Sequence, residues 1–212
     1  MAIKVSGTTV IDDSRQLTNI ASVDATTVAA LGTAGVGGGA WELLNTATAS
    51  GASYLSMTSG MQSGYDYYVA IVDDFRSSVT DVNGFLETTH NGTTWNTSSW
   101  YHQYEKWFST SRAFTYGGSN GRFASSLGFA GSTSPQQWAH FRIEFFNPRN
   151  TDTVKYIKVT GLSYSGFASI VVNGISSTLV STDTSNAIQG FRLFTDSGNV
   201  SGTAKLYGLV NS

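Results

Sequence analysis

The chain of 212 residues has no cysteine and only 2 prolines. The absence of cysteine excludes disulfides and thiolate zinc sites, so stability has to come from core burial or from oligomerisation. Charged residues make up 12% of the chain, about half of the usual share. The polar surface must therefore come mainly from Ser, Thr, Asn and Gly, and this composition suits strands and turns better than helices.

The composition argues against two kinds of partner, nucleic acid and membranes. The formal net charge is −2, and the 12 Lys and Arg residues are scattered along the chain, so no basic patch for nucleic acid is evident. No run of about 18 apolar residues occurs, and the first residues lack the apolar core of a signal peptide. We therefore expect no nucleic-acid partner and no membrane insertion.

Carboxylates and serines do not form a recognisable catalytic pattern. Glycoside hydrolysis needs two carboxylates about 5 to 9.5 Å apart, and nothing in the sequence pairs Glu87, Glu105 or Glu144. Asp73 and Asp74 are neighbours on an expected strand, so we expect them to point to opposite faces and not to act on one substrate. The stretch 118–121 is predicted to be a turn, and we expect no serine nucleophile. The chain is predicted not to be an enzyme.

The three histidines give no metal signature. His90, His102 and His140 are far apart, and none belongs to a His-x-His or His-x-x-x-His pair. No Asp-x-Asp-x-Asp spacing for calcium is present either. We expect no metal site and no cofactor.

The composition changes near residue 40. Residues 32–39 contain five glycines in eight positions, which is typical of a linker. Residues 1–31 hold too few large apolar groups to bury a core, although Asp24 is placed to cap one or two helical turns. They either drape over a neighbouring subunit or form a mobile terminus. We interpret residues 1–39 as an extended N-terminal assembly arm. Its candidate contact residues are Ile3, Val5, Val10, Ile11, Leu17 and Ile20.

Residues 40–212 show strand patterns at short spacing. The segment 65–75 is a nearly continuous apolar run, which predicts a central buried strand. In the segment 139–146, one face carries Ala139, Phe141, Ile143 and Phe145, and the other carries His140, Arg142, Glu144 and Phe146. Turns are expected at Asn83-Gly84, Asn91-Gly92 and Asn173-Gly174, since Asn and Gly tolerate positive φ. These patterns predict an all-β fold, a jelly-roll-like antiparallel β-sandwich preceded by the extended arm.

The C-terminal segment 188–209 predicts two further strands joined by a polar turn. Phe191 and Leu193 fall on one face of the first strand, and Arg192 and Phe194 fall on the other. In the second strand, Leu206 alternates with Lys205 and Tyr207. We expect the two strands to form a hairpin that closes the sandwich, with turn geometry supplied by Asp-Ser-Gly-Asn and Ser-Gly.

Aromatic residues are concentrated between residues 95 and 108, which makes this segment the best candidate for a binding site. Aromatic faces beside amide and hydroxyl groups suit carbohydrate recognition, and they suit a protein interface equally well. By strand alternation, part of the set would instead fill the core. Core, subunit interface and glycan site all remain open. The candidate residues are Trp95, Trp100, Tyr101, His102, Tyr104 and Trp107.

Three parts of the chain carry a resemblance to a known family. The opening consists of the segments 3–13 and 17–20. The middle consists of Tyr65-Asp66-Tyr67-Tyr68-Val69-Ala70-Ile71-Val72, Thr80-Asp81, 85–89 and 91–95. The end consists of Gly190, Phe194, Ser197-Gly198-Asn199, Ser201-Gly202-Thr203 and Leu206-Tyr207-Gly208. In this order they resemble the fibre leader and the β-sandwich module of tailed-bacteriophage virion proteins. Residues 96–135 match nothing in that family.

The resemblance implies a virion structural protein made in the cytoplasm of a bacterial host. It implies a short tail fibre or tail-attached fibre that contributes to host-surface recognition and assembles as a homotrimer. The implied partners are further copies of the chain, other virion proteins bound through residues 1–39, and a host-surface glycan. The alternatives are a capsid decoration or cement protein that stabilises the head, and a glycan-degrading spike enzyme.

Overall fold

The computed structural model describes the chain in segments. They are residues 3–5, 8–11, 26–27, 41–62, 64–79, 82–97, 100–107, 112–118, 121–127, 139–165, 171–181 and 183–209. Within them, only the backbone is described for residues 3–5, 8–11, 100–107, 112–118, 122–127, 163–165 and 171–177. The chain divides into two units, Met1–Gly39 with Ser212, and Ala40–Asn211. Within the described segments, no helix is long and apolar enough to cross a membrane.

The first unit contains a short antiparallel strand pair. β1 (Ile3–Val5) pairs with β2 (Thr8–Ile11), and together they carry four of the predicted arm residues. The other two, Leu17 and Ile20, lie outside the described residues. Thr26 and Thr27, shortly after the predicted cap Asp24, have helical backbone.

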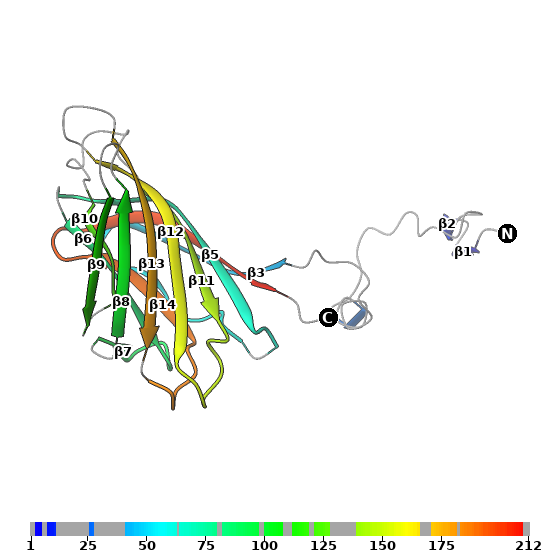
Figure 1. The fold of residues 1–212 in the computed structure, drawn as a ribbon. Coiled ribbons are helices and arrows are strands. Elements are labelled where there is room, and N and C mark those ends of the chain that lie inside the picture. The colour runs from blue at the N-terminus through cyan, green and yellow to red at the C-terminus, as the bar shows by residue number, and fades with distance from the viewer. Residues whose placement is uncertain are drawn as a thin grey trace. The chain divides into compact units, whose positions relative to one another are not determined.

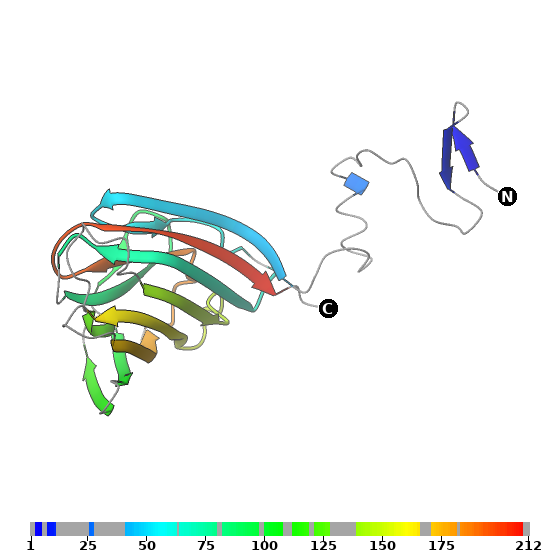
Figure 2. The same cartoon turned by 90° about the horizontal axis from the view of Figure 1, so that it is seen from above.

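The second unit contains two antiparallel sheets (Figures 1 and 2). The larger sheet has eight strands, in the order β3 (Trp41–Ala52), β15 (Val200–Leu209), β5 (Tyr67–Ser77), β11 (Ala139–Phe146), β12 (Lys155–Ser165), β13 (Val171–Ser181), β8 (Trp100–Trp107) and β9 (Arg112–Gly118). The smaller sheet has five strands, in the order β10 (Arg122–Leu127), β6 (Val82–Thr89), β14 (Gly190–Thr195) and β4 (Leu55–Met57), with β7 (Trp95–Asn96) paired to β6.

The strand order is that of a jelly roll. Taken in chain order, its eight strands are β3, β4, β5, β6, β10, β11, β14 and β15. Numbered 1 to 8, they lie in the order 1-8-3-6 in the larger sheet and 2-7-4-5 in the smaller sheet. This alternation between two sheets is the double Greek key of an eight-stranded jelly roll. The prediction of an all-β, jelly-roll-like antiparallel sandwich is confirmed.

Two insertions extend this plan. The first, between β6 and β10, supplies β7, β8 and β9. The second, between β11 and β14, supplies β12 and β13. Apart from β7, these strands prolong the larger sheet beyond β11. From the segment 96–135, for which no resemblance was found, β8 and β9 thus form the far side of the larger sheet, and β10 lies in the smaller sheet.

The core lies between the two sheets. On β11, Phe141 is 3% exposed and Ile143 is fully buried, whereas Phe146 on the other face is 42% exposed. The predicted alternation of this strand is therefore confirmed. Tyr68, Ala70, Val72 and Phe75 of β5 are also fully buried, as expected for a central strand.

Two of the three predicted Asn-Gly turns are wrong. Asn83-Gly84 lies inside β6 and Asn173-Gly174 lies inside β13. Only Asn91-Gly92 lies outside a strand, with Gly92 at φ +79. In β6, the backbone of Gly84 pairs with Thr195 on one side and Ala124 on the other. Long-range pairing of this kind overrides the local turn preference.

The expected C-terminal hairpin is also wrong. β14 pairs with β6 and β4 in the smaller sheet, and β15 pairs with β3 and β5 in the larger sheet. The polar connection between them therefore crosses from one sheet to the other. The predicted faces are nevertheless correct, since Phe191, Leu193 and Leu206 are fully buried.

Candidate functional site

The predicted aromatic site is divided between the two sheets. Trp95 lies on β7 in the smaller sheet, whereas the other five candidates lie on β8 in the larger sheet. On β8 the backbone of His102 is paired with the fully buried Leu179, and that of Tyr101 is paired with Val180. Because faces alternate along a strand, the register divides the β8 candidates into two sets. Trp100, His102 and Tyr104 are at positions of the inner face, and Tyr101 and Trp107 are at positions of the outer face.

Trp95 forms one wall of a clamp around Arg192. The Arg192 Cζ lies 4.5 Å from the Trp95 ring centre and 3.9 Å from that of Tyr54. The Arg192 Nε and Nη2 atoms donate to the Glu87 Oε2 at 2.7 and 2.5 Å. The clamp lies on the outer face of the smaller sheet, since Arg192 lies between the buried Phe191 and Leu193. A guanidinium held in this way joins β6, β7 and β14, and the residue before β4, through its charge and these two ring contacts.

Two of the three candidate catalytic glutamates lie on opposite sides of the sandwich. Glu87 is on the outer face of the smaller sheet, bound to Arg192. Glu144 is on the outer face of the larger sheet, where its Oε1 atom lies 2.9 Å from the Arg142 Nη2 atom. With the core between them, these two carboxylates cannot act on the same glycosidic bond. The third, Glu105, is on β8, where only the backbone is described.

The prediction that Asp73 and Asp74 point to opposite faces is wrong. Both carboxylates approach His140, Asp73 Oδ1 at 3.2 Å from Nδ1 and Asp74 Oδ1 at 3.9 Å from Nε2. The cause is a β-bulge: β5 has one residue more than β11 and β15 at this point, and Asp74 has φ +56. The two carboxylates face different ring nitrogens and do not converge on one point. Within the described residues, no group of three His, Cys, Asp or Glu side chains could hold a metal ion.

The expectation that no serine has the Gly-x-Ser-x-Gly spacing of a nucleophile elbow is wrong, since Gly117-Gly118-Ser119-Asn120-Gly121 has that spacing. An elbow connects a strand to a helix. Here the segment connects strands β9 and β10, and Ser119 itself lies outside the described residues. The topology therefore does not match that of an elbow.

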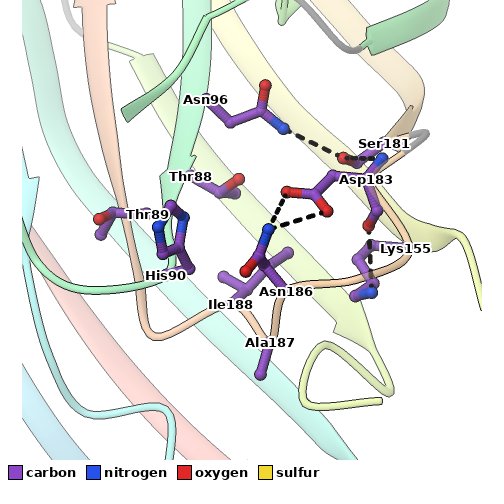
Figure 3. Close-up of a pocket in the computed structure, with 10 residues that line it drawn as sticks. All are labelled: Thr88, Thr89, His90, Asn96, Lys155, Ser181, Asp183, Asn186, Ala187 and Ile188. Atoms are coloured by element: carbon purple, nitrogen blue, oxygen red, sulfur yellow. Dashed lines mark hydrogen bonds between the residues drawn. The ribbon is translucent and has the colours of Figure 1, made fainter. Parts of the chain in front are cut away.

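A small cavity lies beside the buried side chain of Lys155 (Figure 3). Its volume is about 10 Å³, and its lining includes Thr88, Asn96, Ser181 and Asp183. Lys155 is 1% exposed, and its Nζ donates to the backbone oxygens of Thr153 at 3.0 Å and Asp183 at 3.1 Å. Burial lowers the pKa of Lys155. A space of this size holds about one water molecule, so the cavity is not a substrate site.

The outer face of the larger sheet carries the most exposed apolar surface of the described chain. Of the six exposed large hydrophobic residues, five lie on this face: Trp41, Leu43, Phe146, Tyr156 and Leu162. Their exposed fractions lie between 42 and 56%. Exposed apolar side chains gathered on one face mark a site of interaction in many proteins.

Four of its aromatic residues form a row across the strands, which we call the aromatic row: Trp41, Tyr67, Phe146 and Tyr156. The ring centre of Tyr67 lies 5.7 Å from that of Trp41 and 5.1 Å from that of Phe146. Phe146 is paired directly with Tyr156, and Tyr156 with Val180. Val180 is in turn paired with Tyr101, so the backbone pairing continues from the row to Tyr101. Tyr101 is one of the candidate residues predicted from the sequence, at a position of the outer face.

A shallow hollow of about 390 Å³ adjoins the aromatic row. It is lined by Trp41, Val69, Ile71, Arg142 and Tyr207. The row and the hollow were not predicted from the sequence because together their residues come from five strands, β3, β5, β11, β12 and β15. The local signal for this face was the alternation in the strand 139–146, which predicts Phe146 on the face opposite to the buried residues.

No protein-family model matches the chain, and neither a curated protein nor a solved structure matches it. The class to which it belongs is therefore defined by its fold, an antiparallel jelly-roll sandwich whose larger sheet is extended by two insertions.

Proposed function

We propose that this chain is a structural protein of a tailed-bacteriophage virion. In this proposal it is a short tail fibre or tail-attached fibre, it assembles as a homotrimer, and it contributes to host-surface recognition. Residues 1–39 bind other virion proteins, and the jelly roll is the exposed module. The jelly roll is an architecture used in viral capsid proteins and in lectins.

The observation that carries the proposal is where the family-like segments fall on the jelly roll. Tyr67–Val72 lies on β5, the third strand, and 85–89 lies on β6, the fourth. The closing elements fall on β14 and β15, the seventh and eighth strands, apart from 197–199, which lies in the connection between them. The resembling segments thus occupy inner strands of both sheets, whereas the segment without resemblance supplies edge strands, β8 and β9 at the far side of the larger sheet and β10 at the edge of the smaller sheet.

The closing motif has a structural explanation at two of its glycines. A Cβ atom on Gly190 would lie 2.1 Å from the Met57 backbone oxygen, so β14 and β4 could not pair closely with any other residue there. Gly202 has φ +151 and lies opposite the bulge of β5. Both glycines support the interpretation that the motif encodes the sandwich and not a ligand site.

Purified virions test the proposal. A tail fibre should be present in a few trimers per particle and should be labelled at the tail by an antibody raised against residues 40–212. Labelling over the head with hundreds of copies would identify a decoration protein instead. Absence of the chain from washed particles would contradict a virion role altogether.

Truncation tests the role of the two units. A protein lacking residues 1–39 should fold, as judged by cooperative thermal unfolding, but should not be incorporated into particles. The matched control is the full chain, expressed at the same level in the same infection. A truncated protein that is incorporated normally would contradict the assembly role of the arm.

A further inference from the structure

We propose that the outer face of the larger sheet, around the aromatic row, is the surface through which copies of this chain pack against one another. This inference rests on the proposed self-association and adds to it the residues that form the contact. It does not depend on where the protein is located in the particle.

The composition of the surface is that of a subunit interface. Its exposed large hydrophobic residues are aromatic or aliphatic, and the hollow beside the aromatic row contains one charged residue, Arg142. Buried interface cores are enriched in aromatic residues and Arg and depleted in Lys and Glu. The aliphatic members Leu43 and Leu162, exposed by 52 and 56%, gain by contact with protein. They offer no flat ring for a sugar to stack on.

Three polar groups beside the aromatic row, those of Tyr67, Glu144 and Arg142, are already bound to one another. The Tyr67 hydroxyl donates to Glu144, and Glu144 also binds Arg142. Burial and the bond to Glu144 raise the pKa of Tyr67. A glycan site needs polar groups that can exchange water for sugar hydroxyls. Groups that satisfy one another can instead be covered by an apolar partner without being left unpaired.

The edge of the larger sheet is a less suitable docking site than its face. β3 has 12 residues and, among the described strands, pairs only with β15. Its pairing is interrupted by irregularities near Ala49 and Asn45, and Asn45 Oδ1 accepts the neighbouring Thr46 N–H at 2.8 Å. Bulges of this kind protect sheet edges from pairing with another chain. The partner should therefore cover the face.

Charge and connectivity favour a copy of the chain as the occupant. The surface carries both signs, with exposed Lys158 and Lys205 and the carboxylates of Asp73 and Glu144, and a copy of the chain presents the same balanced mixture of charges. The net charge of −2 gives little repulsion between copies. Trp41 also follows directly on the proposed arm, and chains joined by their arms would hold this surface at high local concentration.

The first experiment measures the mass of the full chain by sedimentation velocity over a range of concentrations. The double variant Phe146→Thr/Tyr156→Thr keeps β-forming residues at exposed positions and removes two rings of the aromatic row. We expect self-association of this variant to be weaker by ~10-fold or more, because interface anchors contribute more than other contacts. Tyr54→Thr, which removes a 41% exposed ring just before β4 and outside the proposed contact, is the matched control and should associate like the wild type.

The second experiment does not depend on the double variant folding well. Since the chain has no cysteine, Tyr156→Cys and Tyr54→Cys each introduce a single thiol. Maleimide labelling at position 156 should slow by ~10-fold as association proceeds with rising protein concentration. Labelling at position 54 should not change.

The outcomes separate the two proposals. A wild-type chain that stays monomeric at all concentrations would overturn both the proposed trimer and this surface. A wild-type oligomer with unchanged mass in the double variant and concentration-independent labelling at position 156 would overturn only the surface. If the double variant remains oligomeric but loses adsorption to host cells, the surface binds a host partner and the proposal is wrong.

Discussion

The ring centre of Phe145 on β11 lies 5.2 Å from the ring centre of Phe191 on β14, and this contact joins the two sheets of the sandwich. Both side chains are fully buried. The first belongs to the alternating strand 139–146, and the second belongs to the family-like closing motif. Their contact therefore ties the closing motif to the core of the sandwich.

Phe191→Ala should therefore strongly reduce the free energy of unfolding. Removing a fully buried ring leaves a cavity between the sheets, and the expected loss is about 3–5 kcal/mol. The matched control is Phe194→Ala on the same strand, where the ring is on the outer face and stacks on Phe85. Its expected loss is about 1 kcal/mol. Urea denaturation at one fixed protein concentration would measure both, and equal losses would contradict the assigned faces.

The clamp around Arg192 should depend on the shape of the guanidinium as well as on its charge. Arg192→Lys keeps the charge but loses the two-atom contact with Glu87 and the stacking between Tyr54 and Trp95. A double-mutant cycle with Glu87→Gln should give a coupling energy of about 1–3 kcal/mol, since the pair is mostly buried. The side chains of Arg192 and Glu87 are 16 and 10% exposed. A coupling energy near zero would show that the pair contributes nothing to stability.

Tyr65 should make stability fall with pH in the alkaline range. Its hydroxyl donates to Glu42, and this bond with burial raises the pKa of Tyr65 from 10.0 to about 12. The folded chain thus holds the proton more tightly than the unfolded chain does. The stabilisation is complete below pH 10 and is lost as the pH rises from 10 to about 12.

Tyr65→Phe should flatten this part of the stability curve, measured by urea denaturation at several pH values. Glu42→Gln should flatten it as well, because the hydrogen bond to the carboxylate is the largest cause of the shift. The double variant should behave like either single variant. An unchanged slope in Tyr65→Phe would contradict this origin of the pH dependence.

Gly202→Ala should destabilise the larger sheet. Gly202 has φ +151, and a Cβ atom there would lie 3.1 Å from both the Asp73 oxygen and the Phe75 Cα. Strain at such a position costs about 1–3 kcal/mol. Thr203→Ala, at the next residue of β15, should cost less. Thermal unfolding of the two variants would compare them, and equal stability would argue against a role of the glycine at the bulge.

The fold class could be predicted because the alternation of apolar and polar residues along a strand indicates which side chains are buried. The strand 139–146 has one buried face, so its side chains alternate and the pattern is readable without its partners. The same holds for Phe191 and Leu193 of β14. What could not be predicted is which strands pair. Gly84 and Gly174 resemble turn residues locally, but long-range pairs place them inside strands.

The candidate site was less predictable because it depends on register. Trp95 and Trp100 are five residues apart in the sequence, yet the structure assigns them to different sheets. The bulge that brings Asp73 and Asp74 to one histidine needs an extra residue in β5, which no local pattern indicates. The aromatic row draws Trp41 and Tyr156 from distant strands, so only the assembled sheet shows it.

A map of the virion by electron cryomicroscopy, at a resolution that separates strands, tests the central claim most directly. The account predicts three-fold symmetric density at the tail, with jelly rolls in contact through the outer face of the larger sheet around Phe146 and Tyr156. Density in which that face is turned to solvent, or particles that lack the chain, would contradict it.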